Sequence, residues 1–229
     1  MAASQKYADV PKKPSNPSLT FLDFANKEAN IHPLFKKLAE EQARSGLDTV
    51  PEDKPYKGLF GHREITVENG PGVVAFYGGR QSGAIFSTFF PAVFWDDGDR
   101  HYSLEGYFQY QKAKKFGDTE TMENIINTKS PSIQRKLGEK IKGFDEKVWA
   151  SVRDEVMRTG LRLKFEQNDG LRHRLLMTHK AWLCEATANE KYWACGLNLN
   201  DKNLPNKDVW PGKNTLGVML MQLRDSFHY

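Results

Sequence analysis

The 229-residue chain has few cysteines and no long apolar run. Its two cysteines, Cys184 and Cys195, exclude a disulfide framework and a four-cysteine zinc site. Two unpaired thiols are typical of a reducing compartment. No stretch approaches the roughly 20 apolar residues of a membrane span, and no apolar segment follows the polar start, as a secretory signal requires. We therefore expect an intracellular protein, cytoplasmic or nuclear, with no membrane partner.

The chain also has little excess charge, since its formal net charge is +4. This balance excludes a histone-like or polybasic binder but permits contact with a phosphorylated ligand. The six histidines are scattered without the spacing of metal ligands, so we expect no metal and no cofactor. Hydrophobic residues make up 39% and aromatic residues 12% of the chain, which is enough for a sizeable core.

The chain divides into two parts at about residue 70. Residues 1–70 form an N-terminal arm and helical extension: residues 1–18 are polar and contain prolines, part of 20–45 has helical spacing, and 47–70 read as a linker. Residues 71–229 form the compact domain. We found no internal repeat, and we expect a monomer.

Patterning in the compact part predicts a few short strands among more numerous helices. Asp97-Gly98 supplies the turn of a β-hairpin between Pro91 and Tyr102, and Ser103 is the expected cap of a helix from 104 to 115. The other expected elements are a buried strand at 72–77, a long helix from 145 to 165, a helix near 171–176, a strand at 182–186 and a final helix at 216–227. The fold class is α+β, a compact and mainly helical single domain whose strands are hairpin-connected.

The helix at 104–115 carries the strongest candidate site. Glu105, Gln109 and Lys112 lie at positions i, i+4 and i+7, so that they share one helix face. Such a stripe is usually a solvated surface. The many tyrosines and phenylalanines around it favour a cavity instead.

Other segments carry weaker signals. The loop that begins Gly78-Gly79-Arg80 follows a strand and can approach a phosphate, although an ordinary glycine turn is the simpler explanation. The basic residues Arg162, Lys164, Arg172 and Arg174 are available for phosphates, but such a run is more often a solvated face.

Ordered motifs from about Phe76 to the end of the chain resemble the NADAR domain family, which includes YbiA-like N-glycosidases. The most specific motif is Ser103-x-Glu105-x-Tyr107-Phe108-Gln109-x-Gln111-Lys112-Ala113. Further matching stretches are Phe76-Tyr77-Gly78-Gly79, Phe86-Ser87, Phe116-Gly117-Asp118, Phe144-Asp145 with Trp149, Glu185-Ala186, Trp193 with Gly196, and Trp210-x-Gly212-Lys213-Asn214-x-Leu216-Gly217.

The resemblance implies cleavage of an N-glycosidic bond to ribose by a mainly helical α+β domain without a metal. It associates two substrates with the family: ADP-ribose on a guanine base in nucleic acid, and a phosphorylated pyrimidine ribosylamine of early riboflavin biosynthesis. We expect the first, with ADP-ribosylated nucleic acid as substrate and partner. The second remains an alternative, as does a module that binds ADP-ribose without cleaving it.

Two residues are the expected catalysts. A carboxylate near C1′ stabilises oxocarbenium-like charge or activates water, and Glu105 is the candidate. The neutral amine of Lys112 offers a covalent route through a Schiff base, to which the resemblance also points. If the two groups are buried together, they share a proton and titrate as a unit.

The expected substrate pocket is aromatic and polar. Phe86, Phe89, Trp149 and Trp193 are candidate stacking walls for a base or sugar, although core packing is the more frequent role of any single tryptophan. Gln109 is expected to bond ribose hydroxyls, and Arg80 to face a phosphate. Tyr77, Gly78, Ser87 and Gly196 complete the predicted binding residues.

Overall fold

The computed structural model describes residues 62–65, 72–78 and 85–227. The predicted arm, the predicted helix within 20–45 and Arg80 lie outside this part of the chain. Its elements are β1 (His62–Ile65), β2 (Val73–Phe76), β3 (Pro91–Asp96), β4 (Asp99–Ser103), α3 (Leu104–Lys115), α4 (Thr119–Ile126), α5 (Pro131–Gly138), α6 (Glu146–Ala150), α7 (Arg153–Glu166), α8 (Asp169–Leu176), β5 (Trp182–Glu185), the 3-10 helix η2 (Lys207–Val209) and α9 (Thr215–Ser226). The fold is a compact, mainly helical α+β domain, as expected.

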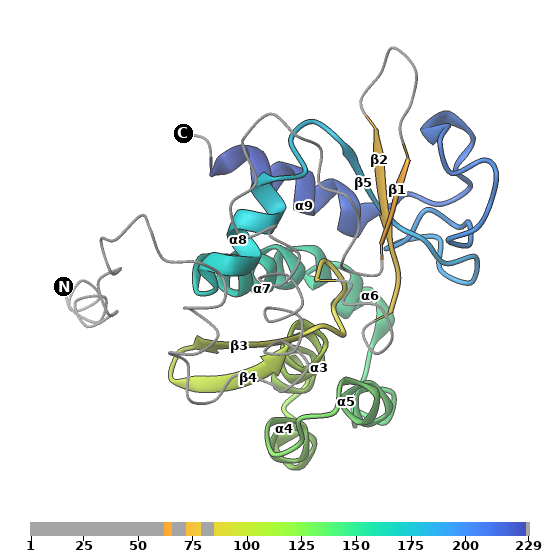
Figure 1. The fold of residues 1–229 in the computed structure, drawn as a ribbon. Coiled ribbons are helices and arrows are strands. Elements are labelled where there is room, and N and C mark those ends of the chain that lie inside the picture. Colours follow the sequence, from red (N-terminus) through yellow and green to blue (C-terminus); the bar gives the residue numbers. More distant parts are fainter. Residues whose placement is uncertain (1–61, 66–71, 79–84, 228–229) are drawn as a thin grey trace.

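One sheet contains three strands in the order β1-β2-β5 (Figure 1). The central strand β2 is buried at all four residues, as its Val-Val-Ala-Phe sequence predicts. It pairs antiparallel with β1 and parallel with β5, so that Phe76 lies opposite Glu185. The expectation that all strands are hairpin-connected was therefore wrong, because β2 and β5 are joined by a crossover that contains the hairpin and α3–α8. Strand β1 falls in the segment expected to be a linker.

The predicted hairpin is confirmed as β3 and β4. Asp97 and Gly98 form its turn with φ values of 49° and 89°, the left-handed conformations that a tight hairpin requires. Strand alternation then turns Phe94 and His101 inward, where both are buried. The hairpin packs against α3 and α7 (Figure 1).

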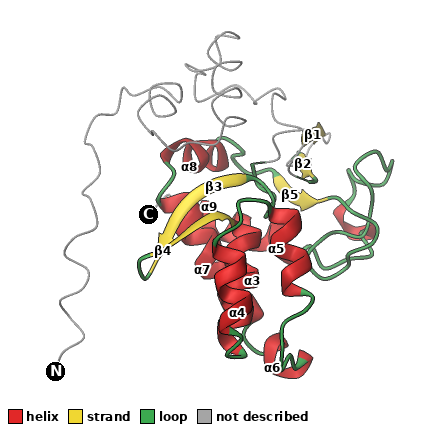
Figure 2. Cartoon of the chain, turned by 90° about the horizontal axis from the view of Figure 1, so that it is seen from below, coloured by secondary structure: helices red, strands yellow, loops and turns green. Residues whose placement is uncertain are grey.

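Helix α3 runs through the centre of the helical part. Its cap is the predicted one, since Gly106 N–H donates to Ser103 Oγ at 2.9 Å. Helices α4 and α5 pack beside it, as the view in Figure 2 shows. On another side α7 approaches closely at Gly160, where an added Cβ would lie 2.6 Å from Leu104 and Tyr107 side-chain carbons. Buried α3 residues thereby join the main hydrophobic core.

The single helix expected from 145 to 165 is two helices. Asp145 caps the first as predicted, because its carboxylate accepts from Val148 N–H at 2.9 Å. The helix ends at Ala150, where Ser151 Oγ donates to the Val148 carbonyl at 2.8 Å. Val152 then has a φ of −125°, outside the helical range, and α7 starts after it. A serine that bonds to nearby backbone offers an alternative to continued helix, which apolar spacing does not reveal.

No helix in the described ranges is both long and apolar enough to cross a membrane.

Candidate functional site

Glu105, the second residue of α3, is a buried carboxylate that three side chains hold in place. It is 3% exposed. Thr88 Oγ1 donates to its Oε2 at 2.9 Å, and Gln109 Nε2 and Arg135 Nε donate to its Oε1 at 3.0 and 3.1 Å. The Glu105 N–H also donates to the Thr88 carbonyl at 2.9 Å. An ionised carboxylate only accepts hydrogen bonds, so this ring of donors suits a fixed negative charge.

Lys112 lies two turns along the same helix and is partly buried. Its Nζ lies 4.9 Å from the centre of the Phe144 ring. Desolvation lowers the pKa of Lys112 below its usual value, while the charges of Glu105, Glu146 and Glu139 oppose this shift. No ion pair or hydrogen bond joins Lys112 directly to Glu105 among the described contacts. The expected shared proton therefore requires the lysine side chain to move.

Glu185 is a second carboxylate near Glu105, and the sequence did not single it out as catalytic. It ends β5, beside the end of the parallel strand β2. Burial, and next the charge of Glu105, raise its pKa from 4.5 to about 7, while Arg135 opposes the shift. Two carboxyl groups with different environments are the usual arrangement of an acid and a base. The available sequence signal was a glutamate at the end of an otherwise apolar strand.

The ends of β2 and β5 bring together other predicted residues. Tyr77 and Gly78 follow β2; Tyr77 is 54% exposed, and Gly78 has a φ of +68° with open space around it. The segment with Trp193 and Gly196 is tied to β5, because Cys195 N–H donates to the Glu185 carbonyl at 2.9 Å. Parallel strand ends on one sheet edge are common places for ligands in α/β sheets.

Two of the expected stacking walls are part of the core instead. Phe86 is 1% exposed and packs edge-on against Phe76. Trp149 is 4% exposed and packs edge-on against Phe108. Both rings therefore belong to the main hydrophobic core of this structure, which for Trp149 is the alternative that the sequence favoured for a single tryptophan. Their apolar character and their place among other aromatics fit a core as well as a pocket, and sequence does not separate the two.

Phe89 and Trp193 are only partly buried and remain candidate walls. The Phe89 ring lies 4.7 Å below the Arg135 guanidinium, which in turn binds Glu105. Trp193 packs edge-on against Phe108 and Tyr192. Arg135, which links Phe89 to the carboxylate, was not predicted. Its distance of 30 residues from Glu105 along the chain gives no local signal.

Gln109 and Ser87 serve the structure of the site. The Gln109 Nε2 donates a hydrogen bond to Glu105, while the buried Gln109 Oε1 has no hydrogen-bond partner among the described atoms. Ser87 is 1% exposed and its Oγ accepts from Phe89 N–H at 3.2 Å. Its hydroxyl is thus turned to the backbone rather than to a pocket.

Lys164, expected on a solvated or phosphate-binding face, is fully buried. Its Nζ donates to the carbonyls of Ile85 and Ser87 at 2.8 and 3.0 Å. Burial lowers its pKa to about 7. Because Thr88 follows Ser87 directly, this lysine fixes the segment that delivers a donor to Glu105. Of the other basic residues in the run, Arg162 pairs with Glu166 and Arg172 with Asp169, whereas Arg174 is buried like Lys164 rather than part of a solvated face.

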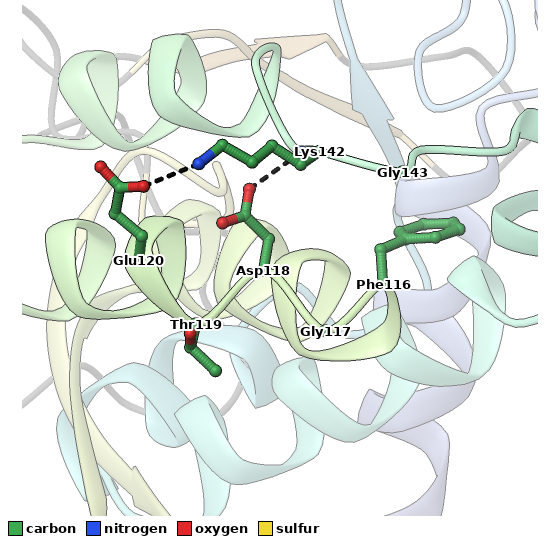
Figure 3. Close-up of a pocket in the computed structure, with 7 residues that line it drawn as sticks. All are labelled: Phe116, Gly117, Asp118, Thr119, Glu120, Lys142 and Gly143. Atoms are coloured by element: carbon green, nitrogen blue, oxygen red, sulfur yellow. Dashed lines mark hydrogen bonds and ion pairs between the residues drawn. The ribbon is translucent and has the colours of Figure 1, made fainter.

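A separate pocket of about 440 Å³ lies between the end of α3, the start of α4 and the segment at 142–143 (Figure 3). Its charges are already satisfied. Lys142 Nζ donates to Glu120 at 2.7 Å, and the Lys142 N–H donates to Asp118 at 2.9 Å. Asp118 also accepts from Thr121 as the cap of α4. The two carboxylates and the lysine that line the pocket are therefore all paired within it.

Fold and site together define a small α+β domain with a hydrogen-bonded carboxylate and a partly desolvated lysine on one helix. A model of the family described as NADAR domain matches residues 75–228. N-glycosidase R617 of Acanthamoeba polyphaga mimivirus is 34% identical over 66% of this chain and 94% of its own. N-glycosidase YbiA of Escherichia coli is 36% identical over 67% of this chain and 87% of its own. The chain belongs to the NADAR domain family.

The fold comparison agrees. The NMR structure of E. coli YbiA superposes with a TM-score of 0.57 at 32% identity, covering 78% of this chain and 94% of YbiA. A more distant relative, the riboflavin biosynthesis protein VVA0006 of Vibrio vulnificus, is 28% identical over 66% of this chain and 38% of its own length.

Proposed function

We propose that this protein is an N-glycosidase that hydrolyses the C1′–N bond of a ribosylated base. One observation carries the proposal, namely that three donors hold the buried Glu105 carboxylate beside two groups with shifted pKa values. The pKa of Lys112, on the same helix, is lowered, and the pKa of Glu185, at the end of β5, is raised. Paired carboxyl groups with separate roles are what glycosidic cleavage needs. The names of the mimiviral and bacterial relatives support the same reaction.

The three groups divide the reaction between them. As the C1′–N bond breaks, positive charge grows on the sugar, and the Glu105 carboxylate stabilises it. Protonated Glu185 gives its proton to the departing base nitrogen. In the covalent route the neutral amine of Lys112 bonds to C1′, and opening of the sugar ring yields a Schiff base. Water then hydrolyses the Schiff base, which releases the sugar and restores the amine.

For the substrate we propose ADP-ribose attached to guanine in nucleic acid. The motif resemblance supports this choice, and so does the partly exposed Phe89 with Arg135 stacked on it beside Glu105. An aromatic ring and a guanidinium suit a base and a phosphate. The name of the Vibrio relative favours a second candidate, a phosphorylated ribosylamine of riboflavin biosynthesis.

A mass-spectrometric cleavage assay distinguishes the candidates. The substrates are a short DNA strand with ADP-ribosyl-guanine, the unmodified strand and the pyrimidine ribosylamine phosphate. The variants are Glu105→Ala, Lys112→Ala and the control Glu123→Gln, which changes an exposed carboxylate on α4. We expect release of ADP-ribose by the wild type and Glu123→Gln, and loss of release in Glu105→Ala.

The other outcomes have definite meanings. Cleavage of the ribosylamine without release from DNA would make the protein a metabolite glycosidase. Silence on both substrates, with tight binding of ADP-ribose, would make it a reader and overturn the catalytic proposal.

A further inference from the structure

The outward face of the β3–β4 hairpin carries aromatic and cationic side chains in alternation. The Arg100 guanidinium lies 5.4 Å from the centre of the Trp95 ring and 5.0 Å from that of Tyr102. Lys129, which lies between α4 and α5, contacts the same Tyr102 ring, with its Nζ 5.0 Å from the ring centre. We call these four residues, Trp95, Arg100, Tyr102 and Lys129, the aromatic–cation row. Trp95 is 47% exposed, so the row ends in an open ring.

The cations of the row are available to a ligand. Within the described part of the chain no carboxylate pairs with Arg100 or Lys129. Arg100 Nε is buried, so any contact of this side chain with an external anion has to be made by its terminal N–H groups. A guanidinium whose faces lie against rings still has its in-plane N–H groups for an anion.

Strand alternation separates the row from the acidic residues of the same hairpin. Asp96 accepts from Gln111 at 2.9 Å, and Asp99 accepts from Tyr110 at 2.6 Å. Both carboxylates are thereby directed to α3, on the side opposite the row. Asp97 in the turn is the exposed acid at its end.

The row is also rigid at its exposed end. Gln167 binds both backbone groups of Trp95, with its Oε1 accepting from the N–H and its Nε2 donating to the carbonyl, each at 2.9 Å. A ring on a strand that a second element fixes in this way is a preorganised stacking surface.

The other end of the row lies next to the catalytic carboxylate. Ser103, which follows Tyr102, donates to Gln134 Oε1 at 2.9 Å. Gln134 Nε2 donates to the carbonyl of Thr128, the neighbour of Lys129, at 2.8 Å. The residue after Gln134 is Arg135, which binds Glu105. Hydrogen bonds among Ser103, Gln134 and Thr128 therefore hold together the chain neighbours of Tyr102, Lys129 and Arg135.

We propose that the aromatic–cation row binds a single strand of nucleic acid that flanks the modified base. Bases stack on exposed aromatic rings, and cations between the rings meet the phosphates, which is how single strands are bound without sequence preference. A duplex keeps its base faces covered by stacking and cannot use the rings. The inference rests on the proposed function, since it supplies the strand that holds the glycosidic substrate.

The test measures strand binding separately from cleavage. The full chain is titrated into an unmodified, fluorescein-labelled DNA single strand of about 12 nucleotides, within the size range of single-strand sites, and fluorescence anisotropy is recorded. The variants are Trp95→Ala, Trp95→Phe and Arg100→Gln. The control Arg158→Gln removes an exposed arginine from α7 that bonds to Gln222 on α9.

We expect Trp95→Ala and Arg100→Gln to weaken strand binding about fivefold or more, Trp95→Phe to restore most of it, and Arg158→Gln to bind as the wild type. Arg100→Gln is also expected to reduce the salt dependence of the affinity by roughly 0.7 in slope. KM for the modified strand should rise in parallel. A Trp95→Ala that melts early in a thermal scan is replaced by Arg100→Gln, which leaves the apolar packing in place.

Equal affinity of wild type and row variants, or preference for a duplex, would overturn the proposal. So would binding of an acidic peptide by the row in place of the strand. If the wild type cleaves the modified strand and the row variants bind the strand with wild-type affinity, the proposed function is supported and the role of the row is refuted. If the wild type binds the strand through the row but cleaves nothing, the proposed function is refuted and the role of the row is supported.

Discussion

Replacing Glu185 by glutamine tests whether this residue is the acid that protonates the leaving base. Glutamine keeps the shape of the side chain but cannot ionise, so the variant has no carboxylic acid proton to give to the leaving base. Burial and the nearby Glu105 charge raise the pKa of Glu185 from 4.5 to about 7. At pH 7 about half of the wild-type molecules therefore keep a proton on a carboxyl group that would be almost fully ionised in water.

The expected size of the effect follows from that value. A group with this pKa is about half protonated at pH 7 and about one tenth protonated at pH 8, so kcat/KM should fall about fivefold from pH 7 to 8 and about tenfold from pH 8 to 9. Glu185→Gln should lose roughly 10²- to 10⁴-fold in kcat, the usual contribution of general acid catalysis. Its residual activity should no longer depend on pH in this range.

The pH dependence of the free energy of unfolding is a second measure of the shifted pKa of Glu185. The folded protein holds the proton more tightly than the unfolded chain, so the contribution of Glu185 to the free energy of unfolding is greatest below pH 4.5. It is lost as the pH rises from 4.5 to 7, by at most about 3–4 kcal/mol at 1.36 kcal/mol per pKa unit. Glu185→Gln should therefore be stabilised relative to wild type at pH 8 more than at pH 5.

The assay is initial rate against pH from 5 to 9, with urea unfolding at pH 5 and 8 beside it. Glu123→Gln, an exposed carboxylate on α4, is the matched control and should follow the wild type in both measurements. A Glu185→Gln variant with normal kcat and an intact alkaline limb would refute the assignment. If only the stability difference appears, the shifted pKa is right and the catalytic role is wrong.

The remaining predictions concern three other residues. Borohydride added during turnover should trap a sugar adduct on the wild type by mass spectrometry, and Lys112→Ala should show none; full turnover by that variant would exclude the covalent route. Thr88→Val removes one donor from Glu105 and should lower kcat about tenfold, measured beside the free energy of unfolding. The lowered pKa of Lys164, about 7, means that the unfolded chain binds the extra proton from pH 7 to 10.5. Stability should therefore rise from pH 7 to 9 by at most about 3 kcal/mol, and Lys164→Met should abolish this rise, as urea unfolding at the two pH values would show.

Local signals in the sequence predicted the elements that local chemistry determines. Asp97-Gly98 predicted the hairpin, and Ser103 predicted the start of α3, because turns and caps depend on neighbouring residues. The break between α6 and α7 was missed, since Ser151 competes with the helix through a hydrogen bond that apolar spacing does not encode. Strand β1 was missed because its pairing partner supplies the structure that its own polar sequence does not predict.

The site shows the same division. Glu105 and Lys112 were found because they share one helix with a fixed period. Arg135 and Glu185 were missed because other elements bring them to Glu105 from distant positions in the chain. The burial of Phe86 and Lys164 was not predicted either, and for Trp149 the sequence left core and pocket both open, since these residue types occur in both environments. Tertiary packing, rather than local pattern, decides these cases.

The shifted groups impose a condition on the covalent route. Lys112 must be neutral to attack, whereas Glu185 must be protonated to release the base. Desolvation lowers the pKa of the lysine and raises that of the carboxyl group, so burial brings the two required states toward the same pH range. Glu105 works against the lysine shift and for the carboxyl shift, because its negative charge favours the bound proton at both. The charge of Glu105 therefore assists departure of the base but disfavours the neutral amine of Lys112. Wherever Lys112 remains charged, water activated by the Glu105 carboxylate is the favoured nucleophile.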